Sequence, residues 1–99
     1  MTINKKANGT ALEIALEGRL DTMTAPELEA ELNQSLTGAE SLTLDFSKLD
    51  YISSAGLRVL LSAHKAMSAK DGMKVTNVNE IVQEVFEVTG FADILNIVK

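Results

Sequence analysis

Two adjacent serines, Ser53 and Ser54, lie between an apolar strand pattern and a run of leucines at helical spacing. The segment from Asp45 to Leu61 reads DFSKLDYISSAGLRVLL, and it predicts a strand, a loop and then a helix that begins at the serines. A helix N-terminus offers free backbone N–H groups and the positive end of the helix dipole, which can hold a phosphate. Ser54 is therefore a candidate for phosphorylation by a partner kinase. The simpler interpretation, that Ser53 is only the N-cap, stays open.

Gly56 falls in the first turn of the predicted helix. Glycine there costs about 1 kcal/mol of helix stability relative to alanine. It is useful where another backbone or a phosphate must approach closely. The glycine therefore favours a functional interpretation of the two serines.

A hydrolase nucleophile is a second chemistry that this pattern could supply. Ser54 and Gly56 match half of the G-x-S-x-G elbow, but Ile52 replaces the first glycine. His64 lies ten residues along the same predicted helix, about 15 Å away at 1.5 Å per residue. This histidine cannot activate Ser54, so acyl transfer by a triad is excluded.

Phosphorylation of Asp45 or His64 is a third possibility, and both residues fit it poorly. Asp45 falls at the predicted end of a central strand, as a receiver-type phosphoaspartate would. Its Mg²⁺ would need further carboxylates at a neighbouring strand end, where only Glu17 is available. His64 falls on the border of an apolar stripe, which is typical of a packed residue.

The composition excludes several classes of protein. The 99 residues, which suffice for one domain over residues 1–99, contain no cysteine and one histidine, so a disulfide framework and a structural zinc site are not expected. A net charge of −5 argues against a nucleic-acid binder. The apolar runs are too short to insert into a membrane, and no leader is recognisable, so we expect a cytoplasmic protein that binds other proteins.

The first part of the chain predicts a β-hairpin followed by a helix. The alternation over Ala11 to Leu16 buries Leu12, Ile14 and Leu16, and the turn signal Asn8-Gly9 places Ile3 to Ala7 beside it as an antiparallel edge strand. Thr24 and Glu27 have the spacing of a capping box, and Met23 and Leu28 that of a hydrophobic staple. These signals predict a helix over Pro26 to Leu36, ended by Gly38.

The remaining elements alternate between strand and helix. The patterns predict a strand at Ser41 to Phe46, a helix at Ala55 to Ala69, and a strand at Met73 to Val78. A further helix is capped by Asn79 and ended by Gly90. Its apolar face consists of Ile81, Val82, Val85, Phe86 and Val88. Ile94 to Val98 fits either a helix or a strand. This order predicts an α/β fold with a mixed, mostly parallel sheet of four to five strands, an N-terminal antiparallel hairpin and three to four helices.

Along its whole length the chain resembles the STAS domain family, in particular bacterial anti-sigma-factor antagonists. The segments that carry the resemblance are Gly18-Arg19-Leu20-Asp21, Leu44-Asp45-Phe46 and Ser53-Ser54-Ala55-Gly56-Leu57-Arg58. The family typically shows Asp-Ser-x-Gly-Leu at the start of its second helix, and the serine two before the glycine is the phosphoacceptor. That serine is Ser54 here, and Asp21 matches a family aspartate close to it. Ser53 departs from the pattern, because antagonists often carry aspartate there, and it becomes a second possible acceptor.

The resemblance implies a binding module, not an enzyme, without cofactor or metal. The unphosphorylated domain would bind an anti-sigma factor with GHKL-type serine kinase activity and so release a sigma factor. Phosphorylation of Ser54 would switch the domain off, and a metal-dependent serine phosphatase would restore it. The implied partner interface comprises Asp21, Thr22, Ser53, Ala55, Gly56 and Leu57, on a monomer that neither binds nucleic acid nor inserts into membranes.

Two other functions stay open. The domain could be a STAS scaffold in a lipid-transport or other signalling complex, in which Ser54 is never phosphorylated. It could also be a weak nucleotide-binding domain that uses a pocket beside Asp21 and Ser54. The chain lacks a glycine-rich phosphate loop with a lysine, which disfavours the nucleotide-binding function.

Overall fold

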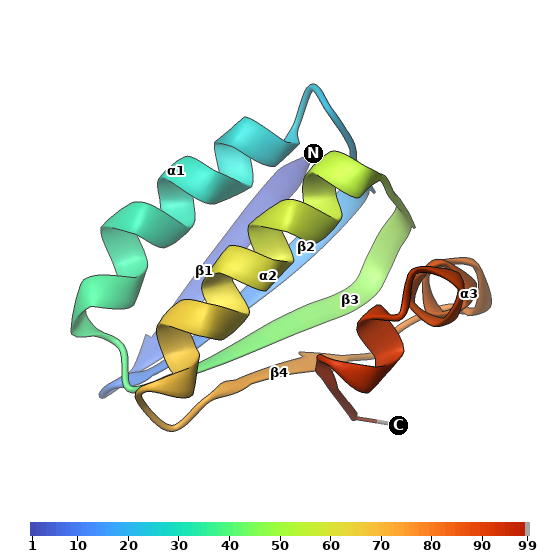
Figure 1. Cartoon of the computed structure of the whole chain (residues 1–99). Helices are drawn as coiled ribbons and strands as arrows, with labels where there is room; N and C mark the ends of the chain where they lie inside the picture. The colour runs from blue at the N-terminus through green and yellow to red at the C-terminus, as the bar shows by residue number, and fades with distance from the viewer. Residues whose placement is uncertain (99) are drawn as a thin grey trace.

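The computed structural model describes residues 1–98, and its strands form one five-stranded sheet in the order β1-β2-β3-β4-β5 (Figure 1). β1 runs antiparallel to β2, and all other neighbours are parallel, which confirms the predicted mixed sheet with its N-terminal hairpin. The elements are β1 (Thr2–Asn8), β2 (Ala11–Leu20), α1 (Ala25–Ser35), β3 (Ser41–Ile52), α2 (Ser54–Ser68), β4 (Met73–Thr76), α3 (Glu80–Thr89) and β5 (Asn96–Val98), with short 3₁₀ turns at Leu36–Gly38 and Phe91–Asp93.

Helices α1 and α2 lie side by side across one face of the sheet, and α3 is seen nearly end-on beside β3 and β4 (Figure 1). The alternating apolar residues of β2 and β3 are buried beneath the helices: Leu12, Ile14, Leu16, Leu42, Leu44 and Phe46. The residues between them, such as Glu13 and Thr43, point to the other face and stay exposed or half-buried. The period-two pattern therefore predicted correctly which side of these strands forms the core.

The hairpin turn lies one residue later than the sequence predicted. Asn8 pairs with Ala11, so the two loop residues are Gly9 and Thr10, not Asn8 and Gly9. Gly9 has a φ of +65°. A positive φ at the first central position is what a type II′ hairpin turn requires, and glycine adopts it without steric cost.

Strands β2 and β3 both extend beyond their predicted ends. The segment 47–52, predicted as a loop, continues β3 as far as Ile52, and β2 runs on to Leu20. Two register shifts explain the error, because β3 inserts one extra residue opposite Ala15–Glu17 and another opposite Gly18–Arg19. Each bulge resets the alternation. The buried Leu49 and Ile52 therefore fall out of the period-two pattern that marks the first half of the strand.

The C-terminal third differs from the sequence prediction at three places. β4 ends at Thr76, before the predicted Val78, because Asn77 adopts a left-handed φ of +57°. The undecided tail contains a short strand, β5. In α3 only Val82 and Phe86 are fully buried, and Phe86 packs against Phe46 with ring centroids 6.4 Å apart.

The predicted apolar face of α3 is therefore only partly in the core. Ile81 is 59% exposed and Val88 80% exposed, while Val85 is half-buried. The predicted caps of this helix are confirmed: the Asn79 side chain accepts from Val82 N at 2.8 Å, and Gly90 ends the helix with a left-handed φ of +84°. Within residues 1–98, no helix is both long enough and apolar enough to cross a membrane.

Candidate functional site

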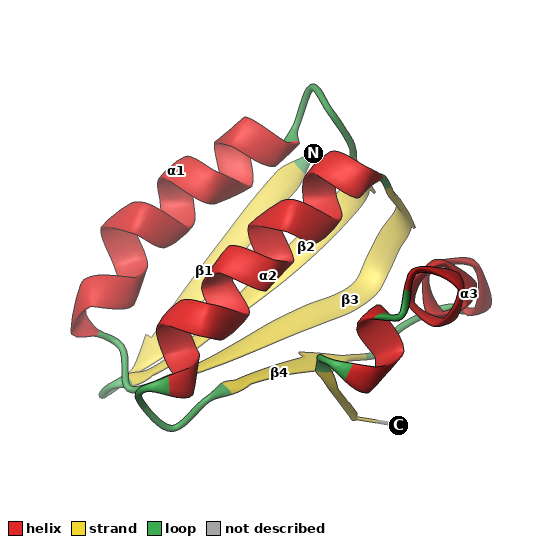
Figure 2. Ribbon diagram, in the orientation of Figure 1, coloured by secondary structure: helices red, strands yellow, loops and turns green. Residues whose placement is uncertain are grey.

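The candidate site lies where the loop after β2 meets the beginning of α2, at one end of the molecule (Figure 2). The backbone N–H of Ser53 donates to the carbonyl of Leu20 at 2.9 Å, which ties the two segments together. Asp21 and Thr22 follow directly after Leu20, and Ser54 follows directly after Ser53. The structure thus brings together the two segments that the sequence predicted as one surface.

Ser53 is the N-cap of α2, as predicted. Its hydroxyl oxygen accepts from Gly56 N at 3.5 Å, and its carbonyl accepts from Leu57 N at 3.0 Å. Ser54 is consequently the first residue of the helix and is exposed. No hydrogen bond within residues 1–98 involves its hydroxyl, so no carboxylate or imidazole there accepts its proton as a base would. The Ser54 hydroxyl is therefore accessible but not activated by this chain.

Gly56 and Leu57 lie below this surface, in the core. A Cβ on Gly56 would stand 2.7 Å from Leu20 Cγ and 2.9 Å from Ile52 Cγ1. The absence of a side chain at Gly56 therefore lets α2 pack closely against the ends of β2 and β3 of the same chain. This contact accounts for the glycine without a partner, and a place for Gly56 and Leu57 in an interface stays a prediction. Asp21, Thr22, Ser53, Ser54 and Ala55 are half-buried or exposed at this site.

The capping box predicted for α1 does not form. Thr24 adopts helical dihedral angles and makes no side-chain cap. Its hydroxyl accepts from Asp21 N and donates to Arg19 O, both at 2.8 Å. The Asp21 carboxylate instead holds the turn that precedes α1, because its Oδ1 accepts from Met23 N at 3.0 Å and from Thr24 N at 3.1 Å. Met23 is 83% exposed, so the predicted staple with Leu28 is also absent.

Asp21 stays ionised at this surface. Partial burial alone would raise the pKa of its carboxyl group, but the bonds from Thr24 and Met23 and the charge of Arg19 together lower the pKa. Arg19 Nε lies 3.7 Å from Asp21 Oδ2, and its guanidinium lies over the ring of Tyr51 at 4.6 Å. The loop therefore presents a fixed negative charge close to the start of α2.

A shallow groove of about 220 Å³ runs between the first turns of α1 and α2. It is lined by Thr22, Ala25, Pro26, Glu29, Ala55, Arg58 and Val59. Arg58 is exposed and lies four residues after Ser54, which puts the two side chains on the same face of α2. The sequence prediction did not select Arg58 as a site residue, although the i, i+4 spacing from Ser54 was the available signal.

Asp45 and His64, the other two candidates for phosphorylation, both lie within regular secondary structure. Asp45 lies in the middle of β3, not at its end, and its Oδ1 accepts from Asn77 Nδ2 and Ser47 N, both at 2.9 Å. The bonds from Asn77 and Ser47 lower the pKa of this carboxyl group. His64 is half-buried in α2, and no partner for its Nδ1 lies within the described residues. Within those residues no three histidine or acidic side chains gather as a metal site.

Comparison with known proteins finds a matching domain family and relatives that are named anti-sigma factor antagonists. The family model described as "Mlab, STAS domain" matches residues 3–98. BtrV of Bordetella bronchiseptica, provisionally named an anti-sigma factor antagonist, is 41% identical over 81 residues, 80% of this chain and 70% of that protein. The anti-sigma-B factor antagonist of Bacillus subtilis is 26% identical over 98 residues, 98% of this chain and 90% of that protein.

Solved structures share the fold at low sequence identity. An anti-sigma factor antagonist from Mycobacterium paratuberculosis superimposes with a TM-score of 0.88 at 20% identity, over 97% of this chain and 83% of that chain. The antagonist SpoIIAA in its unphosphorylated form has a TM-score of 0.84 at 18% identity, over 99% and 89%. SpoIIAA from Bacillus in its phosphorylated form has a TM-score of 0.75 at 17% identity, over 99% and 92%.

Proposed function

This chain belongs to the STAS domain family, and from that premise we propose that it is an anti-sigma factor antagonist whose binding is switched by phosphorylation of Ser54. In this proposal the unphosphorylated domain binds an anti-sigma factor in the cytoplasm, and the anti-sigma factor is itself a GHKL-type serine kinase. Its sigma factor is then released. A metal-dependent serine phosphatase removes the phosphate and resets the domain.

The exposed Ser54 hydroxyl at the first position of α2 is the observation that carries the proposal. Ser53 takes the cap, so Ser54 is free to meet a second protein. The relatives named anti-sigma factor antagonists support the partner class. That SpoIIAA exists in phosphorylated and unphosphorylated forms supports a switch of this kind. The partner must supply the base as well as the nucleotide that donates the phosphoryl group, since no residue within 1–98 accepts a hydrogen bond from the Ser54 hydroxyl.

A phosphate on Ser54 changes the charge of the surface that the partner reads. It adds about −1.5 to −2 charges to a surface that already carries the ionised Asp21, whose carboxylate is fixed in the neighbouring loop. An interface over this surface would have to desolvate both negative charges, and that is unfavourable without a cation from the partner. The free N–H groups of the first turn of α2 and the side chain of Arg58 can hold the phosphate on the domain itself. The phosphorylated domain would therefore stay folded and lose its partner.

The experiment is a kinase and binding assay with an anti-sigma factor of the GHKL class from the same genome and Mg-ATP. Intact mass should rise by one phosphate, and peptide mapping should place it on Ser54. Ser54→Ala should resist phosphorylation and bind constitutively. Ser53→Ala is the matched control: it removes the neighbouring hydroxyl and the cap, yet should still be phosphorylated.

Two outcomes would contradict the proposal. A phosphate mapped to Ser53, or a Ser54→Ala variant modified as fast as the parent, would overturn the site. Failure of every such kinase to bind the unphosphorylated domain would favour a scaffold in which Ser54 is never modified.

A further inference from the structure

The C-terminal quarter of the chain carries most of the net charge. From Val75 to Lys99 there are four acidic side chains and one lysine, so this segment contributes −3 to a total of −5. Three of the acids, Glu80, Glu84 and Glu87, follow one another along α3 at spacings of four and three residues. Residues so spaced lie on one side of a helix. We call these three glutamates the α3 acidic stripe.

Nothing within residues 1–98 neutralises the α3 acidic stripe. The ion pairs of the described part of the chain are Lys5–Glu31 and Arg19–Asp21, and neither involves α3. Like charges at these spacings destabilise a helix. Glu87 also lies near the C-terminal end of α3, where a negative charge opposes the helix dipole and the last turn has no basic residue. Positive groups supplied from outside the domain would remove both penalties.

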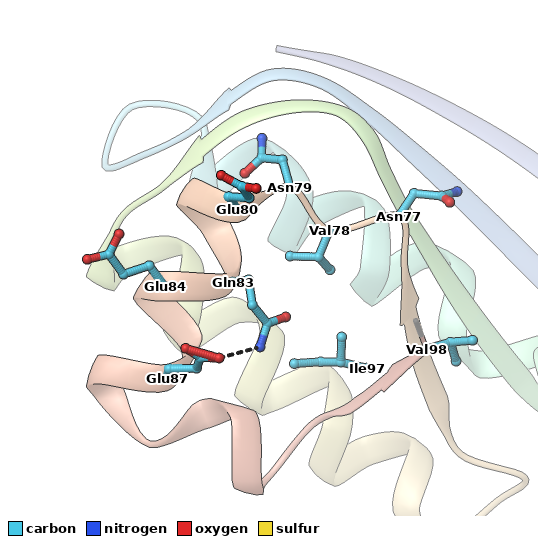
Figure 3. A pocket seen from close by; sticks show the side chains of 9 residues that line it. All are labelled: Asn77, Val78, Asn79, Glu80, Gln83, Glu84, Glu87, Ile97 and Val98. Atoms are coloured by element: carbon cyan, nitrogen blue, oxygen red, sulfur yellow. Dashed lines mark hydrogen bonds between the residues drawn. The ribbon is translucent and has the colours of Figure 1, made fainter.

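A hollow of about 730 Å³ opens between the α3 acidic stripe and β5. In Figure 3, Val78, Gln83 and Ile97 lie around it from three different segments, and the glutamates follow one another along the helix side. Gln83 Nε2 donates to Glu87 Oε1 at 3.4 Å, which links a polar residue of the hollow to this end of the stripe. The hollow therefore combines an apolar floor with an acidic rim.

An apolar stripe borders the acidic one on the same helix. Ile81, Val85 and Val88 recur at spacings of four and three residues, and Ile81 and Val88 are mostly exposed. Together with Glu84 they line a second, shallower hollow of about 260 Å³. Glu84 thus lies between the two hollows and belongs to both. The acidic row and the apolar row therefore run side by side along α3. Such a surface suits an amphipathic helix, whose apolar face can cover the apolar row.

We propose that α3 and β5 form a second docking surface, which binds a basic amphipathic helix of a partner protein. Leucine-like side chains of that helix would cover Ile81 and Val88, and its lysines or arginines would pair with the α3 acidic stripe. Charge complementarity selects this occupant, because an acidic surface repels nucleic acid and anionic lipid. The surface shares no residue with the Ser54 site, so it can be occupied whether or not Ser54 is phosphorylated.

The test uses the full chain labelled with ¹⁵N and a synthetic helical peptide of leucine and lysine, with one leucine face flanked by lysines. Amide shifts should change along α3 and at Ile97 and Val98, and binding should weaken as salt is added. Glu84→Lys should lower the affinity roughly tenfold, as the loss of a close charge pair does. The control Glu40→Lys makes the same charge change before β3, at the other end of the sheet, and should bind like the parent.

A second variant separates helix docking from simple charge attraction. Val88→Ser removes an exposed apolar side chain without disturbing the core, and it should also weaken binding severalfold. Unchanged affinity in Val88→Ser would overturn the proposal, as would shifts centred outside α3 and β5, or equal binding of a leucine–glutamate peptide. Self-association through this face without peptide binding would show that a second copy is the occupant, and would overturn it too.

Discussion

Leu20 and Gly56 touch so closely that a single methyl group between them would collide with the leucine. A Cβ added to Gly56 would lie 2.7 Å from Leu20 Cγ and 3.1 Å from Leu20 Cδ2. Leu20 is fully buried at the end of β2, and its carbonyl accepts from Ser53 N. This contact therefore sets how near α2 can approach the loop that carries Asp21, and with it the geometry of the Ser54 surface.

Gly56→Ala should destabilise the domain by about 1–2 kcal/mol, as the cost of overpacking exceeds the gain in helix propensity. Helix propensity alone would predict the opposite, namely that Gly56→Ala is more stable than the parent. Urea unfolding measures the difference. Gly38→Ala is the control: a Cβ at Gly38 meets no atom within 4 Å, so its stability should be unchanged or higher. A Gly56→Ala variant as stable as the parent would refute the packing account.

Thr24→Val should cost about 1 kcal/mol, because the Thr24 hydroxyl both accepts from Asp21 N and donates to Arg19 O. Thr24→Ser keeps that hydroxyl and should stay near the parent in thermal unfolding. Glu27→Ala tests the rejected capping box, in which Glu27 would bond back to the start of the helix. A loss in Glu27→Ala as large as that in Thr24→Val would restore the capping box.

If Ser54 carries a phosphate, Arg58 should lower the second pKa of that phosphate below its ordinary value of about 6. Opposite charge nearby favours the dianion. Phosphoserine can be introduced at position 54 during synthesis, and the ³¹P shift followed against pH. Arg58→Gln should raise the phosphate pKa, whereas Lys65→Gln, near the other end of α2, should leave it unchanged. Equal pKa values in all three proteins would exclude a role for Arg58.

The carboxylate of Asp45 should make stability depend on pH. The bonds from Asn77 and Ser47 hold its pKa below the ordinary aspartate value of 3.8. A lowered pKa means that the unfolded chain binds the proton more readily, so the stabilisation is present at neutral pH and is lost as pH falls below about 4. Asp45→Asn should be less stable than the parent at pH 7, and the gap should close in acid.

The control for Asp45 is Asp50→Asn, which removes one carboxylate from an exposed position of the same strand. No hydrogen bond to the Asp50 side chain occurs within residues 1–98, so this variant should follow the parent closely at pH 7. A gap between parent and Asp45→Asn that persists unchanged in acid would show that the carboxylate charge does not strengthen these bonds.

Local patterns in the sequence determined the order of elements and the identity of much of the core. The alternation at Leu12, Ile14 and Leu16 and the caps at Ser53 and Asn79 depend on neighbours within a few residues, so they could be predicted correctly. The position of Ser54 at the start of α2 follows from the same local signals. Its expected role came from resemblance to a family motif, and it remains a prediction.

Only the tertiary structure decided how these elements meet. The bulges of β3 depend on pairing with β2, and the packing of Gly56 on Leu20 joins residues that are distant in the chain. Thr24 makes no side-chain cap for α1, because its hydroxyl accepts from Asp21 N and donates to Arg19 O instead. The exposure of Ile81 and Val88 depends on how α3 turns against β3. Such outcomes are set by contacts between segments, which no spacing within one segment encodes.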